Sequence, residues 1–450
     1  MLPVRRVSIW FVPVVSAALL AVAGAARAGG DSGAALEKVA ERPTTLPSLV
    51  TLPEAIRLFR EHGFDRLLAD AATLRSEGDV AAMAHVANPG VSIAGSRSFN
   101  LRPDEPPYAL SGSLDDNGAI FDVLTGKRSL RGRAASAALD AARSHRASVE
   151  LELEALVKQA YVQVAFTHLQ VDFTKQQVEW LGKGAEIARL RHPGVMDDGA
   201  LARVEVQKLE ADQAATSAVS GARLAQVALA LLMGVRGPIP DFDVDRTVLA
   251  YKVPAGIANA TEASLVAFAM QHRPELAESR SSAASASATL SLEKRRVFPE
   301  VVLGAFGNWS GGVGPTVLAP PTVGGVVAFD LPLLYQRQGE VRRAEADVST
   351  RTLLARRAEA SIVQDVTSAF AAVNAARAQV ERMLGGGLLE AAKIQRDILQ
   401  KQFDAGSAKL TDWLDAQRTY AAVELEYLQH VADFWTAVFQ LERAIGAELS

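Results

Sequence analysis

Apolar residues recur every three or four positions along several long stretches of the chain. One stretch has seven of them in succession: Ile362, Val366, Ala369, Val373, Ala376, Val380 and Met383. A seven-residue apolar repeat favours coiled-coil packing. The last stretch carries two such stripes, Ala421, Leu425, Leu428, Ala432, Trp435 and Phe439, and Val431, Phe434, Val438 and Leu441. Two stripes on one helix predict two neighbouring helices.

One of these predicted helices is exceptionally long. The pattern runs from about residue 342 to residue 402, and such a helix would measure about 90 Å at 1.5 Å per residue. A rod fits this length better than a compact enzyme does. The pattern is interrupted only by Gly385–Gly387, which indicate either a hinge or a tolerated irregularity.

Four short runs change the pattern from helical to strand-like. They cover residues 89–99, 117–125, 299–310 and 324–333, and combine Val, Ile, Phe or Trp with small residues. Segments rich in Pro, Gly and Asp separate the two runs of each pair. A sheet of four strands has two open edges, which lipid does not tolerate. The sequence therefore predicts association of several chains.

The order of these features is written twice, at an offset of about 207 to 210 residues. Pro89 aligns with Pro299, "IFDVL" with "AFDLP", and Gly199 with Gly406. We expect a first repeat over 51–235, a connector over 236–260 and a second repeat over 261–450. Each repeat has a helix, two strands and a long helical hairpin, with hairpin tips near residues 199 and 406.

The N-terminus is typical of a secretory signal peptide. Two arginines precede the apolar run "IWFVPVVSAALLAVAGA", and Ala26-Arg27-Ala28 is a small-residue cleavage site. We expect a signal peptide over 1–28 and a linker over 29–50. No later run reaches the roughly 18 to 20 apolar residues of a membrane helix. The expected product is exported, as a periplasmic protein or as a β-barrel protein.

Charge and composition narrow the function further. The chain has a net charge of −4, and removal of three N-terminal arginines makes it about −7, which disfavours nucleic-acid binding. With no cysteine, disulfides, thiolate metal sites, a cysteine nucleophile and a lipid anchor on cysteine are excluded. The chain lacks GxSxG, HExxH and Walker A motifs, and its seven histidines are scattered. We predict no enzyme, no catalytic residue, no cofactor and no metal site. Asp122 and Asp330, which align across the repeats, fit a lumen rim and turn capping equally well.

Three segments together resemble the TolC-type outer-membrane efflux family. They are "GKRSLRGRAASAALDAA" from Gly126, "FDLPLLYQRQGEVRRAEADV" from Phe329 and "FDAGSAKLTDWLDAQRTYAAVELEYLQHVADFWTAVFQLERAIG" from Phe403. The second is most similar to the branch serving metal and drug pumps of the resistance–nodulation–division (RND) type.

The resemblance implies a mainly α fold with a β-barrel portion. A homotrimer would close a twelve-stranded outer-membrane barrel that continues into a periplasmic α-helical tube. The channel would be passive. Its partners would be a periplasmic adaptor (membrane fusion) protein, an inner-membrane RND-type pump, outer-membrane lipid and its own copies, with no nucleic acid.

The resemblance also assigns roles to single residues. Gly199, Ala200, Leu201, Gly406 and Ser407 would form the tips that the adaptor contacts. Asp412 and Asp415, three residues apart on one helix face, would form an acidic ring at the periplasmic entrance. Alternatively, they are acids favoured by the start of a helix. The first repeat has Glu205 and Lys208 at the equivalent places and does not repeat the pair.

Two other functions compete with efflux of small molecules or metal ions. One keeps the channel and changes the cargo to protein, as in type I secretion. The other is a periplasmic coiled-coil scaffold without a pore, which the strand-like runs disfavour. The cargo, the particular pump and adaptor, and the resting state of the tip are left open by the sequence.

Overall fold

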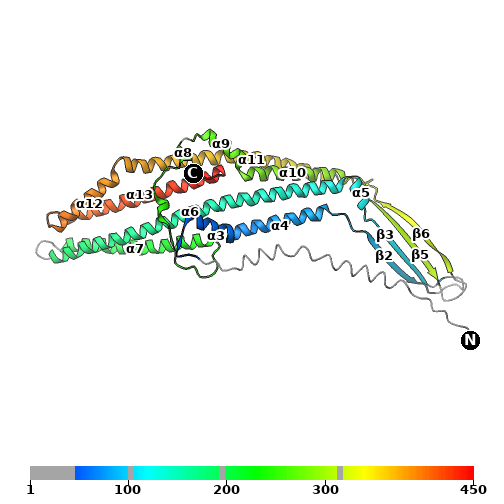
Figure 1. Cartoon of the computed structure of the whole chain (residues 1–450), viewed down its shortest axis with the longest axis horizontal. Helices are drawn as coiled ribbons and strands as arrows, with labels where there is room; N and C mark the ends of the chain where they lie inside the picture. Colours follow the sequence, from blue (N-terminus) through cyan, green and yellow to red (C-terminus); the bar gives the residue numbers. More distant parts are fainter. Residues whose placement is uncertain are drawn as a thin grey trace, which may run out of the picture.

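The computed structural model describes residues 46–99, 106, 108–191, 198–258, 260–311 and 318–449. The expected signal peptide, 1–28, and most of the expected linker lie outside the described residues. The protein is an elongated helical body with a four-stranded sheet at one end (Figure 1). Both helical hairpins reach the opposite end.

The first repeat begins with two helices and a β-hairpin. Helix α3 (Leu52–His62) and helix α4 (Phe64–Ala84) meet at Gly63. Strands β2 (Gly90–Arg97) and β3 (Tyr108–Asp115) follow, then the short helix α5 (Ala119–Leu124). The long hairpin consists of α6 (Lys127–Arg191) and α7 (Asp198–Leu232).

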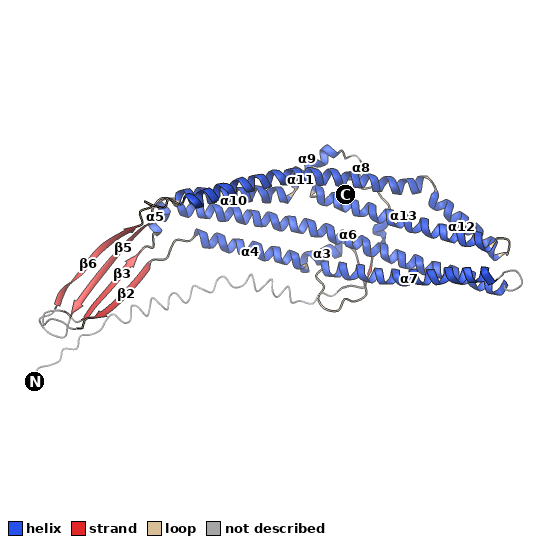
Figure 2. Ribbon diagram, turned by 180° about the vertical axis from the view of Figure 1, so that it is seen from behind, coloured by secondary structure: helices blue, strands red, loops and turns tan. Residues whose placement is uncertain are grey.

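The second repeat has the same order. Helices α9 (Glu262–His272) and α10 (Pro274–Arg295) lead to β5 (Val301–Gly311) and β6 (Leu318–Phe329). The hairpin is formed by α11 (Gln338–Gly385), α12 (Leu388–Asp404) and α13 (Leu410–Ile445). Figure 2 shows the helices running nearly parallel along the body.

Between the repeats, the connector forms a small belt on the helical body. It contains β4 (Asp243–Val244), the 3-10 helix η1 (Arg246–Leu249) and α8 (Ala255–Ala258). Strand β1 (Leu49–Val50) pairs with β4 in parallel. The end of the expected linker is thus a short strand, because its backbone bonds to the connector.

The prediction of a strand over 117–125 is wrong. Residues Ala119–Leu124 form α5, and the strand lies earlier, at Tyr108–Asp115. The carboxylate of Asp116 accepts hydrogen bonds from the amides of Gly118 and Ile120, which turns the chain into a helix. The true strand, "YALSGSLD", has the small polar residues of a loop, which concealed it.

The other strands are shifted by a few residues from their expected bounds. The strand expected over 324–333 begins earlier, at Leu318, and ends at Phe329. It therefore includes Pro320 and Pro321, which a strand at the edge of a sheet tolerates. In the described protomer β6 is such an edge, since the order is β2-β3-β5-β6.

The register of the antiparallel sheet places most large apolar side chains on one face and the small polar ones, with Val302, Phe306 and Val326, on the other. Ile93 opposite Gly112, Leu110 opposite Trp309, and Leu303 opposite Val327 lie on one face. Ser92 opposite Ser113, and Asn308 opposite Thr322, lie on the other. Both faces are largely exposed in the protomer, and β2 and β6 have open edges.

The heptad residues form the core of the helical body. All seven apolar positions from Ile362 to Met383 are buried, and so are Val157, Val164 and Val171 on α6. Both stripes on α13 are buried or half-buried, as its two neighbours require. A separate cluster at the far end joins both hairpins through α6, α7, α12 and α13.

The long helix expected over 342–402 is interrupted. Helix α11 ends at Gly385, and α12 begins at Leu388 after Gly387, whose φ is +63°. The glycine run therefore introduces a real break, because a left-handed residue cannot continue an α-helix.

Helix α7 is more apolar than the sequence analysis predicted for any segment after the N-terminus. It contains a segment long and apolar enough, by length and composition, to cross a membrane, although no such segment was expected after the N-terminus. In the structure α7 packs along α6, with Ala218 and Ala222 near Val171. Its outer side exposes Val206, Leu209, Leu224 and Leu231. This composition suits a helix with packing partners on more than one side.

Candidate functional site

The turn between α12 and α13 is compact. Gly406 has a φ of +80°, and the amides of Ser407 and Ala408 donate to the carbonyl of Gln402 at 2.8 and 3.2 Å. The hydroxyl of Ser407 donates to the same carbonyl. Glycine is needed at the left-handed position, so residue 406 lies at the turn, as the sequence spacing indicated.

Asp412 and Asp415 are exposed on α13 directly after this turn. The opposite face of the helix is fixed by Trp413, which is fully buried and stacks on Phe403 with ring centroids 4.6 Å apart. The indole N–H of Trp413 donates to Gln400 Oε1 at 2.8 Å. This packing sets the rotation of α13 and directs both carboxylates away from the core of the protomer.

Neither carboxylate is neutralised within the described part of the protomer, where no ion pair involves either of them. Asp412 accepts a bond from the Thr411 hydroxyl at 3.3 Å. The first repeat differs, because Glu205 pairs with Arg189 at 3.0 Å. The two hairpins thus present different charge at the same end of the molecule.

A groove beside Asp415 was not expected from the sequence. It has a volume of about 500 Å³ and is lined by α7 and α13, with Arg203, Gln207, Asp415 and Arg418 among the lining residues. Arg418 follows Asp415 by one helical turn, and this spacing was the available signal. The surface around the acids is therefore of mixed charge.

The tip residues of the first hairpin lie in the first turn of α7. Gly199 is exposed, whereas Ala200 and Leu201 are half-buried against the cluster that contains Trp413. The structure therefore brings residues 199–201 and the 404–410 turn to the same end of the body (Figure 1).

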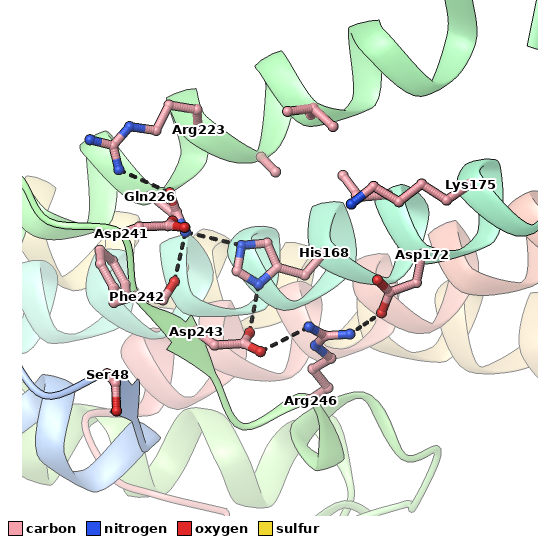
Figure 3. A pocket seen from close by; sticks show the side chains of 13 residues that line it. Ser48, His168, Asp172, Lys175, Arg223, Gln226, Asp241, Phe242, Asp243 and Arg246 are labelled. Atoms are coloured by element: carbon pink, nitrogen blue, oxygen red, sulfur yellow. Dashed lines mark hydrogen bonds and ion pairs between the residues drawn. The ribbon is translucent and has the colours of Figure 1, made fainter. Parts of the chain in front are cut away.

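A second candidate is a cavity of about 710 Å³ under the connector (Figure 3). His168 Nδ1 lies 2.7 Å from Asp243 Oδ1, and Arg246 pairs with both Asp243 and Asp172. Gln226 Nε2 donates to Asp241 Oδ1 at 2.9 Å and to the carbonyl of Phe242 at 2.6 Å.

These contacts determine the ionisation of Asp243 in the cavity wall. Burial favours the neutral form of Asp243, but hydrogen bonds from His168 and Arg246 outweigh it and lower the pKa of the carboxyl. Among the described residues, no group of three or more His, Asp or Glu is placed to hold a metal ion. The network ties the connector to α6 and α7. His168 gave no signal in the sequence, since its partner is 75 residues away.

Comparisons with known proteins agree on the class. Residues 265–447 match the family described as Outer membrane efflux protein. Over 441 residues the chain is 23% identical to the cobalt-zinc-cadmium resistance protein CzcC of Cupriavidus metallidurans, with 97% of this chain and 99% of that protein covered.

Solved channel structures have the same fold. The open state of the MtrE outer membrane channel of Neisseria gonorrhoeae superposes with a TM-score of 0.72 at 17% identity, over 91% of this chain and 95% of that one. The outer membrane protein VceC of Vibrio cholerae gives 0.70 at 16% identity, over 89% and 97%. CusC gives 0.72 at 15% identity, over 88% and 92%. The mainly α architecture with a strand portion is therefore that of outer-membrane channels.

Proposed function

We propose that the chain is the passive exit channel of a tripartite efflux system, because residues 265–447 match the outer membrane efflux protein family and the chain has the fold of outer-membrane channels. The observation that carries the proposal is the sheet. One face is mostly apolar, the other carries the serines together with Val302, Phe306 and Val326, and both edges are open. Such a sheet satisfies its backbone in lipid only when several copies close it into a barrel.

The proposed assembly is a homotrimer with twelve strands in the outer membrane. The apolar face, with Ile93, Leu110 and Trp309, contacts lipid, and the serine-rich face lines the lumen. The helical body extends into the periplasm, which requires export by an N-terminal signal peptide. The exposed apolar residues of α7 and α12, such as Leu224 and Ile394, are covered by neighbouring copies.

The far end of the helical body is the proposed entrance. Residues 199–201 and Gly406–Ser407 contact a periplasmic adaptor, which joins the channel to an inner-membrane RND-type pump. Asp412 and Asp415 of every copy face the axis, where unpaired carboxylates concentrate cations and repel anions. Their exposure, and the absence of ion pairs within the described protomer, support this role.

The cargo is proposed to be small molecules or metal ions, with divalent metal ions preferred. Similarity to CzcC, a cobalt-zinc-cadmium resistance protein, extends over nearly the whole of both chains. An acidic entrance suits cations. Protein secretion has no comparable support.

Single-channel conductance in a planar bilayer tests the proposal. We expect discrete cation-selective events that divalent cations block from the periplasmic side. In the Asp412→Asn/Asp415→Asn variant, block should need about tenfold more divalent cation, as for a loss of about 1.4 kcal/mol. Asp433→Asn removes one carboxylate from α13 far from the turn and should leave block unchanged. Equal block in all three proteins would refute the role of Asp412 and Asp415 at the entrance. Absence of conductance from folded oligomers of all three would count against the channel.

A further inference from the structure

A cavity of about 730 Å³ lies where the sheet joins the helical body. Its walls come from α5, the start of α6, the segment between α10 and β5 and the segment between β6 and α11. They include the cations Lys127, Arg131, Arg296 and Arg337, and the apolar residues Phe298, Leu331, Leu333 and Leu334. Figure 1 places α5 at this junction, next to the sheet.

The junction is basic in a chain that is acidic overall. Residues 119–133 and 293–343 together contain ten Lys and Arg but five Asp and Glu, whereas the whole chain has a net charge of −4. The cavity wall has four cations and three carboxylates, Asp122, Glu300 and Asp330. The excess of positive charge is therefore carried by the whole basic collar, which we define as the Lys and Arg residues of these two segments.

The cations in the cavity wall are compensated to different degrees. Arg131 pairs with Asp122, and Arg337 Nη2 lies 4.0 Å from Glu340 Oε1. Lys127 is only 7% exposed, and its ammonium donates to the carbonyl of Phe298 at 3.0 Å. In the described part of the chain no carboxylate lies within ion-pair distance of it. Glu293 serves two guanidinium groups, Arg296 at 2.7 Å and Arg337 at 3.0 Å.

Arg337 also has a hydrogen-bond donor without a partner among the described residues. Its Nε is buried and has no hydrogen-bond partner among the described residues, and its backbone is left-handed with a φ of +58°. A buried N–H without a partner is destabilising. The Arg337 side chain as a whole is 34% exposed, and phosphate is a favoured partner of Arg and Lys, so a bound anion can contact the exposed part of this guanidinium.

The apolar side of the cavity continues the apolar face of the sheet. Phe329 ends β6 on that face, and Leu331, Leu333, Leu334 and Tyr335 follow it, with Leu334 99% exposed. Helix α5 exposes Ile120, Val123 and Leu124 nearby. Apolar and aromatic side chains next to a basic collar match the edge of a bilayer, where acyl chains end and phosphates begin.

We propose that this cavity binds the headgroup phosphate of an anionic phospholipid in the periplasmic leaflet of the outer membrane. Lys127, Arg296 and Arg337 contact the phosphate, and Leu331–Leu334 lie along the acyl chains. The inference rests on the proposed function, which places the sheet in that membrane. A second copy of the chain is a poorer occupant, because its own collar carries the same excess of positive charge.

Native mass spectrometry of the detergent-extracted oligomer tests the site. The oligomer is exchanged into mixed micelles with equal amounts of phosphatidylglycerol and phosphatidylcholine, and retained lipids are counted. We expect phosphatidylglycerol to be preferred about tenfold, since clustered Lys and Arg near the membrane surface attract anionic headgroups. The Lys127→Gln/Arg337→Gln variant should lose this preference. Lys183→Gln/Lys393→Gln is the matched control, because both lysines are exposed, lie outside the collar and do not line the cavity.

Further arms keep the result interpretable if the double variant folds poorly. Leu333→Ser/Leu334→Ser leaves the cations in place and should reduce retention of both lipids. Equal retention of the two lipids by the wild type, or an unchanged preference in a folded Lys127→Gln/Arg337→Gln oligomer, would refute the site. Displacement of the lipid by inorganic phosphate at equal concentration would indicate a site for the free ion and would also refute it.

Failure of the proposed function is distinguishable from failure of this site. If the chain does not fractionate with the outer membrane as a heat-modifiable oligomer, the channel proposal itself fails. If it does, but shows no preference for the anionic lipid, only the lipid site fails.

Discussion

At the scale of single residues, close packing near the tip restricts which side chains α6 can carry. Gly184 on α6 faces the indole of Trp413, and a Cβ at residue 184 would lie 2.1 Å from that ring. A Cβ at Gly182, two residues earlier on the same helix, would have no atom within 4 Å. Both glycines lie within α6, but only residue 184 lacks room for a side chain.

Alanine substitutions should separate these two glycines. Gly184→Ala should lower stability by about 1 to 3 kcal/mol, because the ring of Trp413 must shift in a filled core. Gly182→Ala should raise stability by roughly 1 kcal/mol, the usual gain for alanine over glycine in a helix. Thermal unfolding followed by circular dichroism measures both. Similar midpoints for the two variants would contradict the described packing.

Two buried groups on α6 determine how the protein responds to alkali. Burial, opposed by a backbone hydrogen bond at Asp245, raises the pKa of Tyr161 to about 12. Burial lowers the pKa of Lys158, but hydrogen bonds and charge from Glu442 and Glu448 outweigh it, so the net pKa is raised. Both shifts favour the folded state only while the groups hold their protons.

Stability should therefore fall as the pH rises above about 10. An unfolded tyrosine ionises near pH 10, whereas the folded Tyr161 stays neutral to about pH 12, so unfolding is favoured in that window. The contribution of Lys158 is complete below the pKa of an unfolded lysine and is lost through its higher folded pKa. Tyr161→Phe should cost about 1 kcal/mol at neutral pH and should flatten the decline between pH 10 and 12. Unfolding midpoints from pH 8 to 12 measure this, and parallel curves would exclude Tyr161 as the cause.

At the scale of elements, the heptad pattern predicted the helices well because burial along a helix depends on local spacing. Residues Ile362 to Met383 are buried as the pattern required. The strands were harder. The composition of "YALSGSLD" predicts a loop and that of "AIFDVL" a strand, because small residues lack a hydrophobic signal and the Asp116 cap acts across the turn. The network around His168 was missed because its partners come from three separate elements.

The break between α11 and α12 depends on one glycine of the run. Gly387 has a φ of +63°, whereas a Cβ at Gly385 would meet nothing within 4 Å. Gly387→Ala should cost about 1 to 2 kcal/mol, the penalty of a left-handed alanine. Gly385→Ala should stabilise the end of α11 by about 1 kcal/mol. Thermal unfolding of the pair measures this, and a stabilising Gly387→Ala would mean that α11 and α12 can form one continuous helix.

At the scale of the whole molecule, the sheet and the helical body satisfy different environments. The helices bury apolar stripes among themselves, whereas the sheet exposes apolar residues on one face and serines on the other. The same substitution should therefore have different effects on neighbouring residues of one strand.

Lysine at Ile93 and at Ala94 should report this difference. Ile93 belongs to the apolar face and Ala94 to the small polar face. Ile93→Lys should cost about 2 to 4 kcal/mol if residue 93 lies near the middle of the bilayer, and less near its surface. Ala94→Lys should be tolerated in an aqueous lumen. The yield of heat-modifiable oligomer in outer-membrane fractions measures both, and equal yields would contradict the assignment of the faces.

The strand order β2-β3-β5-β6 has a kinetic consequence. The outer edges belong to the first and last strands of the order, and in the proposed trimer neighbouring copies complete their backbone hydrogen bonds. In that assembly a single chain is an incomplete folding unit, and the step that completes it requires encounters between chains. Its rate should depend on the number of chains in transit more steeply than linearly. At low synthesis rates the open edges persist longer, and factors that protect strand edges would then decide how much protein reaches its final assembly.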